Sequence, residues 1–175
     1  MTRALMTALA TGLLASLIPS TALAGPDSFG PGPVIPGFGP IANIEDHLEI
    51  PEGTVFRVSF DTSTGAQDDG LNSTLTSAAR FINMHAAAGV PVENIHLAII
   101  IHGGAVHDVS LHRAGPNAEL VAALIENGVR IQICGQSAAW YDVTGDDLLP
   151  GVEMALSAMT AHALLQSEGY TLNPF

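Results

Sequence analysis

The sequence predicts an α/β domain, a three-layer α/β/α arrangement in which a mostly parallel sheet lies between helices. Two observations predict this fold class. Short apolar runs rich in β-branched residues alternate with segments whose apolar residues recur at helical spacing. Strand and helix follow each other at the spacing typical of βαβ units, whose right-handed crossovers build parallel sheets covered by helices.

Residues 1–24 have the features of a cleavable secretory signal. Arg3 lies in a short basic leader, an uncharged apolar run follows from Ala4 to Ile18, and small residues end at Ala24. The run of about 15 residues is shorter than the ~20 needed to span a bilayer, which disfavours a membrane anchor. We therefore expect cleavage after Ala24 and a soluble protein outside the cytoplasm, with no membrane attachment. In a bacterium that compartment is the periplasm.

Residues 25–53 form a second region, rich in proline and glycine and without helical or strand periodicity. This composition predicts an extended arm. The arm is nevertheless too apolar for a disordered linker, with Phe29, Val34, Ile35, Phe38, Ile41 and Ile44. We expect it to pack on its own domain or on a neighbouring subunit.

The α/β domain is expected over residues 54–175, and its first half contains two strands and a helix. The segment 54–60, TVFRVSF, is typical of a strand, and residues 72–88 have helical periodicity. The run IHLAIIIHG, residues 95–103, is almost continuously apolar. Such a run is typical of a central parallel strand that is buried on both faces.

The second half continues the same alternation. Asn117 is the expected N-cap of a helix that ends before Gly128, and the strand VRIQIC, residues 129–134, follows. Residues 151–157 are a candidate fourth strand. Ser157 is a candidate cap for a last helix over residues 158–168, and residues 170–174 are a candidate short fifth strand.

The only cysteine, Cys134, ends the third expected strand. In a parallel sheet, ligands bind beyond the carboxyl ends of the strands, so three stretches should meet there: residues 61–70, 102–112 and 134–138. Gly135, Gln136 and Ser137 look like the start of a helix, whose free amides would favour a nucleophilic thiolate. The alternative is a small buried side chain that fills space at a strand end.

His102 ends the preceding expected strand and is followed by Gly103 and Gly104, which leave room for a ligand or partner. If the second and third strands are neighbours, their ends lie ~5 Å apart, near enough for an imidazole to pair with the thiolate of Cys134. The alternative is a histidine that only makes structural hydrogen bonds. The candidate catalytic residues are thus Cys134 and His102, and the candidate ligand-binding residues are Gly103, Gly104, Gly135, Gln136 and Ser137.

Charge and missing motifs exclude several classes of function. The chain has 17 Asp and Glu against five Lys and Arg, a net charge of −12 at pH 7 that disfavours nucleic-acid binding. Dinucleotide, nucleotide, serine-hydrolase and dithiol motifs are absent, so no cofactor is expected. His102, His107 and His112 are spaced five apart, which fits neither of the common zinc spacings, so we expect no metal site.

The segments ARFINMHAAAGVP, IHLAIIIHG and PNAELVAALIENGVRIQICGQSAA, with the closing LLPGVEMALSAMTAHALLQSEGYTLNPF, resemble the DsrE/DsrF-like family, in particular its exported branch. The most specific parts are CGQSAA and GYTLNPF. The resemblance implies a five-stranded parallel sheet with neighbouring second and third strands. It also implies a homotrimer or homohexamer, and a persulfide on the cysteine that follows the third strand, here Cys134.

One departure limits what the resemblance implies about partners. Cytoplasmic sulfur-relay members have basic residues soon after the cysteine, whereas this chain has AAWYDV. The partner proteins of those members are therefore not assigned to this chain. Two hypotheses remain. In the first, Cys134 is a solvent-reachable carrier that takes sulfur from one protein and passes it to another, without being a turnover enzyme. In the second, the chain is a non-catalytic oligomeric binding module with a small-ligand or metal site at the sheet edge and a buried cysteine.

Overall fold

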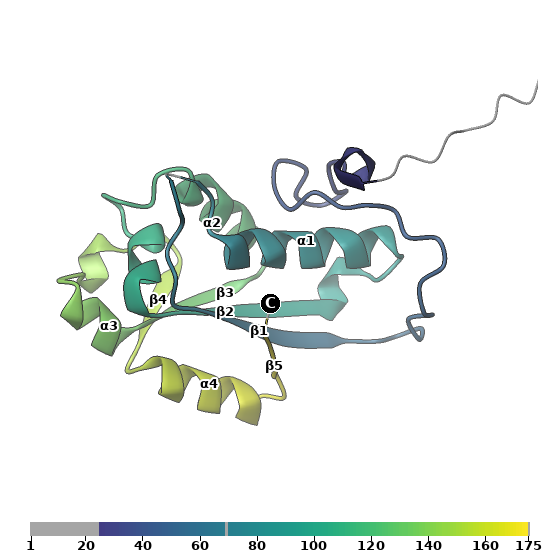
Figure 1. Cartoon of the computed structure of the whole chain (residues 1–175). Coiled ribbons are helices and arrows are strands. Elements are labelled where there is room, and N and C mark those ends of the chain that lie inside the picture. Colours follow the sequence, from purple (N-terminus) through teal and green to yellow (C-terminus); the bar gives the residue numbers. More distant parts are fainter. Residues whose placement is uncertain (1–24, 69, 175) are drawn as a thin grey trace, which may run out of the picture.

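The computed structural model describes residues 25–68 and 70–174, and its centre is a five-stranded parallel sheet (Figure 1). The strands are β1 (Phe56–Thr62), β2 (Ile95–Ile101), β3 (Arg130–Cys134), β4 (Val152–Ala155) and β5 (Thr171–Asn173). Their order is β4-β3-β2-β1-β5, and every neighbouring pair is parallel. The predicted contact between the second and third strands is therefore confirmed. The predicted signal segment lies outside the described residues.

Helices cover both faces of this sheet, which confirms the three-layer α/β/α prediction. Figure 1 shows α1 (Ser73–Ala87) and α2 (Asn117–Glu126) over one face and α4 (Ala158–Ser167) over the opposite face. The short α3 (Gly135–Trp140) begins where β3 ends. A 3-10 segment, Gly103–Val109, follows β2 and was not expected from the sequence. None of the helices in the described part of the chain is long and apolar enough to cross a membrane.

Local sequence explains most of these boundaries. The side chain of Asn72 accepts hydrogen bonds from the amides of Thr74 and Leu75 and so begins α1, and Ser157 begins α4 in the same way through Thr160. The prediction that Asn117 caps α2 was wrong. Asn117 is the first helical residue and its buried amide group instead accepts the N–H of Asn72, which ties the two helix starts together.

The main core lies between the sheet and the layer of α1 and α2. It contains alternate residues of the strands, including Phe60, Ile99 and Ile133, packed against helix residues such as Leu75 and Leu120. A smaller cluster fills the other face, where Ala98 and Ile100 of β2 pack against Ala161 and Leu165 of α4. Successive residues of a strand point to opposite faces. The position of a residue in its strand therefore decides whether its side chain faces α1 and α2 or faces α4.

The arm of residues 25–53 packs along α1 of the same chain, through the fully buried Asn83. Its side-chain oxygen accepts the amides of Val34 and Ile35, and its nitrogen donates to the carbonyls of Ile35, Phe38 and Gly39. Gly39 needs to be glycine, because its φ is +61° and a Cβ atom would lie 2.3 Å from a backbone nitrogen of α1. One helix residue therefore satisfies the polar groups of a whole turn of the arm.

Candidate functional site

Cys134 is the last residue of β3 and the N-cap residue of α3, so the predicted helix start beside the cysteine is confirmed. A second helix also begins there. Cys134 is paired with Ala155 at the end of β4, three residues before Ala158 opens α4, and the amide of Ala158 acts on the sulfur. The positive ends of two helices thus converge on one thiol.

The polar groups around the sulfur favour its thiolate form. Burial of Cys134 raises the pKa of the thiol, but the hydroxyl and amide of Ser137 and the amides of Ala158 and Gln136 lower it by more. The net effect holds the pKa below its usual value. The side chain of Cys134 makes no capping hydrogen bond at the start of α3. Its pKa is lowered by the combined effect of several donors from α3 and α4.

The structure buries most of the thiol. Cys134 is only 6% exposed, which agrees better with the alternative of a small buried side chain than with a freely solvent-reachable cysteine. The reason is the position of β4 and of the turn that leads into α4. Gly135 approaches them so closely that a Cβ atom on it would lie 2.7 Å from the carbonyl oxygen of Ala155. A reactant therefore reaches the sulfur only through a restricted opening or after a local movement.

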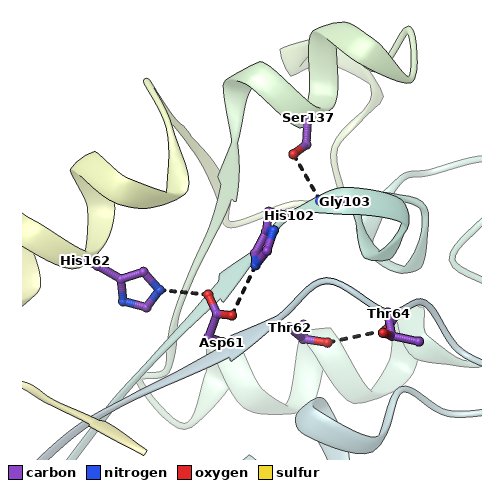
Figure 2. A network of polar contacts seen from close by, with 7 residues as sticks. All are labelled: Asp61, Thr62, Thr64, His102, Gly103, Ser137 and His162. Atoms are coloured by element: carbon purple, nitrogen blue, oxygen red, sulfur yellow. Dashed lines mark hydrogen bonds and ion pairs between the residues drawn. The ribbon is translucent and has the colours of Figure 1, made fainter. Parts of the chain in front are cut away.

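His102 lies at the end of β2, and its ring contacts a carboxylate. Its Nε2 atom is 3.1 Å from Oδ1 of Asp61, and Nε2 of His162 is 2.8 Å from Oδ2 of the same group (Figure 2). Burial raises the pKa of Asp61, whereas the hydrogen bonds and charges of His162 and His102 lower it, and the net shift is downward. Asp61 is therefore an ionised carboxylate held between two imidazoles.

The sheet register places His102 beside Cys134. Ile101 pairs with Ile133, so the next residues of the two strands, His102 and Cys134, are adjacent. Neighbouring parallel strands are ~4.8 Å apart. His102 is not among the groups that lower the pKa of Cys134, however. The structure thus brings the two predicted catalytic residues to one place, but the direct partner of His102 is Asp61.

The two glycines after β2 differ in whether they leave space for a ligand. Gly103 has a φ of +52°, and a Cβ atom there would lie 2.8 Å from the carbonyl oxygen of Ser63. Glycine is therefore required by the turn itself. Gly104 does line a pocket of about 330 Å³ at this edge of the sheet, together with Asp108 and Arg113.

The other candidate binding residues contact the protein itself. Gln136 donates through its side chain to the carbonyl of Leu156 at 3.2 Å. The Ser137 hydroxyl accepts the N–H of Gly103 at 3.0 Å (Figure 2). Its own proton is left free to act on the sulfur of Cys134. Gly135, Gln136 and Ser137 therefore build the surroundings of the thiol.

The three histidines that are spaced five residues apart, His102, His107 and His112, do not form a metal site. His102 contacts Asp61, whereas Nε2 of His107 lies 2.9 Å from the guanidinium of Arg113. Burial, and then the charge of Arg113, lower the pKa of His107. Across residues 25–68 and 70–174, no three His, Cys, Asp or Glu side chains are grouped to hold a metal ion.

Two site residues were not predicted from the sequence. Asp61 is the first residue of the stretch 61–70, which was expected at this edge, but the residue itself was not singled out. His162 was not singled out either. It reaches Asp61 across 101 residues of sequence because α4 packs over the ends of the strands. The one signal in the sequence that could have pointed to Asp61 is the alternation of side chains along β1, which places Asp61 on the face covered by α4.

Comparisons with known proteins agree with this architecture. The sequence profile of the DsrE/DsrF-like family matches residues 58–174. A protein of unknown function from Methanobacterium thermoautotrophicum, MTH1491, is 20% identical with a TM-score of 0.51, covering 69% of this chain and 99% of its own. The ychN protein of E. coli is 13% identical with a TM-score of 0.52, covering 69% of this chain and 100% of its own. No curated protein matches.

Proposed function

Because the chain belongs to the DsrE/DsrF-like family, we propose that it is a sulfur carrier that holds sulfane sulfur as a persulfide on Cys134. The carrier takes this sulfur from one partner and passes it to another. It makes one transfer per cycle and needs no cofactor.

The observation that carries this proposal is the convergence of α3 and α4 on the sulfur. Amides of Gln136, Ser137 and Ala158 and the Ser137 hydroxyl lower the pKa of the thiol in spite of its burial. A thiolate is the nucleophilic form of cysteine. The same donors can stabilise the negative charge of a bound persulfide, so one arrangement serves both loading and storage.

The loading step is an exchange between a thiol and a persulfide. The thiolate of Cys134 attacks the outer sulfur of a donor R–S–SH, the donor S–S bond breaks, and its electron pair stays on the departing R–S⁻, which takes up a proton. Cys134 becomes Cys134–S–SH and the donor becomes R–SH. Sulfane sulfur moves without net oxidation, so no separate oxidant or reductant enters the step.

Intact mass measurement tests the carrier role. Purified protein is treated with inorganic polysulfide, desalted and weighed beside the Cys134→Ser variant treated in the same way. We expect the wild type to gain mass in steps of about 32 Da per sulfur atom and the variant to gain none. A wild type that stays unmodified while a free-thiol reference protein is loaded would refute the carrier role.

The low exposure of Cys134 favours a second candidate, a non-catalytic binding module in which the cysteine is a packing residue. At 6% exposure, Cys134 resembles the small buried cysteines of many cores. Titration with a thiol reagent separates the two functions. Labelling within minutes under native conditions supports the carrier, whereas labelling only after unfolding supports the binding module.

Export and assembly are further parts of the proposal. Residues 1–24 have the pattern of a secretory signal, which supports function in the periplasm. Exposed apolar side chains support a homotrimer or homohexamer; they include Leu48 at 93%, Met159 at 79% and Leu156 at 73%. N-terminal sequencing of protein from the periplasmic fraction and light scattering at micromolar concentration test the two points. A retained leader or a monomer mass would contradict them.

A further inference from the structure

We propose that Asp61 is a positioning residue which fixes His102 so that one defined ring nitrogen exchanges protons with the sulfur chemistry at Cys134. This inference rests on the proposed carrier function. His162 completes the arrangement by holding the second oxygen of the Asp61 carboxylate.

The first step is that these residues lie on one face of the sheet. Ala98 and Ile100 of β2 pack against α4, so the alternation of the strand puts His102 on the same face. The backbone of His102 is still extended and its amide donates to Thr62 at 2.9 Å, which continues the strand pattern. Asp61 pairs with Ile100 in the neighbouring strand and therefore shares this face with His102.

The second step concerns the proton on each imidazole. An ionised carboxylate only accepts hydrogen bonds, so Nε2 of His102 and Nε2 of His162 must both carry the proton that they share with Asp61. In the neutral ring the lone pair is then on Nδ1. Asp61 thereby selects one tautomer for both histidines.

The third step separates the roles of the two histidines. Nδ1 of His162 is buried and without a partner in the described chain, so it cannot readily exchange a proton with a reactant. The side chain of His102 is 33% exposed, and no contact within residues 25–68 and 70–174 occupies its Nδ1 atom. His102 is therefore the member of the pair that can accept and return a proton, and His162 is a clamp on Asp61.

The fourth step is the connection from His102 to the thiol. The residue after His102 is Gly103, whose N–H donates to the hydroxyl of Ser137 (Figure 2). This hydroxyl lowers the pKa of Cys134. The ring of His102 is thus fixed by Asp61 and its backbone is fixed to the start of α3. The register then keeps His102 next to Cys134 in the neighbouring strand.

In the transfer step, Nδ1 of His102 accepts the proton of the Cys134 thiol as the Cys134 sulfur attacks the outer sulfur of the donor R–S–SH, and the donor S–S bond breaks with its electron pair on R–S⁻. The same proton then passes from the imidazolium to the departing R–S⁻, giving R–SH and neutral His102. The Asp61 carboxylate stabilises the imidazolium between these events. The titratable groups that face His102 are Asp61 on β1 and Cys134 on β3, and His162 on α4 acts through the carboxylate.

Nitrogen NMR of the histidine side chains tests the positioning directly, without any sulfur donor. In the wild type at neutral pH we expect neutral His102 to be present almost entirely with its proton on Nε2. In Asp61→Asn we expect a mixture of tautomers, and Asp61→Glu should restore most of the wild-type pattern. A wild-type His102 protonated mainly on Nδ1 would overturn the inference, even if the variants failed to fold.

The rate of sulfur loading from a small hydropersulfide, followed against pH, tests the role in transfer. We expect His102→Gln to slow loading roughly 100-fold and Asp61→Asn to slow it less. Asp61→Glu should recover part of the rate, and the exposed His112→Gln should match the wild type. An Asp61→Asn variant that loads sulfur as fast as the wild type at every pH would overturn the inference. A wild type that takes up no sulfur would instead refute the carrier function, and the tautomer measurement would still decide how His102 is held.

Discussion

The backbone N–H of Gly103 donates to the hydroxyl of Ser137 at 3.0 Å, which joins the end of β2 to the first turn of α3. Through this bond the two candidate catalytic residues, Cys134 and His102, are fixed relative to each other. The Ser137 hydroxyl has one proton to donate, and because it accepts from Gly103 it can direct that proton to the sulfur. Ser137 therefore both supports the turn and stabilises the thiolate.

Replacement of Ser137 should change the ionisation of Cys134. In Ser137→Ala the hydroxyl, the largest of the donor contributions to the sulfur, is lost while the backbone amide of residue 137 remains, which should raise the pKa of the thiol toward its usual value of 9.0. Alkylation by iodoacetamide should then be slower at pH 7, and the midpoint of its pH profile should move upward. At high pH, where both proteins are thiolates, the rates should converge. Ser167→Ala, at the exposed end of α4, should leave the profile unchanged.

The close approach at Gly135 predicts a loss of stability. In Gly135→Ala the new Cβ atom would lie 2.7 Å from the carbonyl oxygen of Ala155, which is backbone and cannot rotate away. We expect a loss of about 1–3 kcal/mol in urea unfolding, as is typical of overpacking. Gly145→Ala is the matched control, because nothing lies within 4 Å of its Cβ position. Equal stability of the two variants would show that the contact at Gly135 is not tight.

Loss of the Asn83 side chain should detach the arm from α1. Asn83→Ala removes all the bonds between this side chain and residues 34, 35, 38 and 39, and leaves buried backbone groups without partners. Each such group costs about 1–3 kcal/mol. Limited proteolysis should then cut within residues 25–50 much faster than in the wild type. Asn43→Ala, at an exposed position of the same arm, should be cut at the wild-type rate.

The pKa of Asp61 predicts how stability depends on acid. The folded-state pKa of Asp61 lies below its usual value of 3.8. The ionised Asp61 carboxylate therefore makes its full contribution to the free energy of unfolding above pH 3.8. This contribution is lost as the pH falls through the lower pKa that Asp61 has in the folded protein. Urea midpoints measured from pH 7 to pH 2 should decline less steeply at the acid end in Asp61→Asn than in the wild type. Parallel declines would show that the two histidines do not stabilise the carboxylate.

Much of the fold could be predicted because its signals are local. The apolar run of β2, the helical spacing of α1 and the cap at Ser157 each depend on a few neighbouring residues, and all three were confirmed. The helix start after Cys134 was predictable for the same reason. The role of Asn117 was not, because its side chain bonds to Asn72, 45 residues away, and a local cap would have looked the same in sequence.

The sequence by itself determined the α/β class and the position of the single cysteine at a strand end. The pairing of the strand of Cys134 with the strand before His102 was only implied by the family resemblance. Only the tertiary structure decided how open the thiol is and what His102 binds. Both depend on where α4 packs over the sheet, since its first amide acts on Cys134 and its His162 reaches Asp61. The packing of a helix depends on contacts summed over the whole layer, and no short stretch of sequence contains that information.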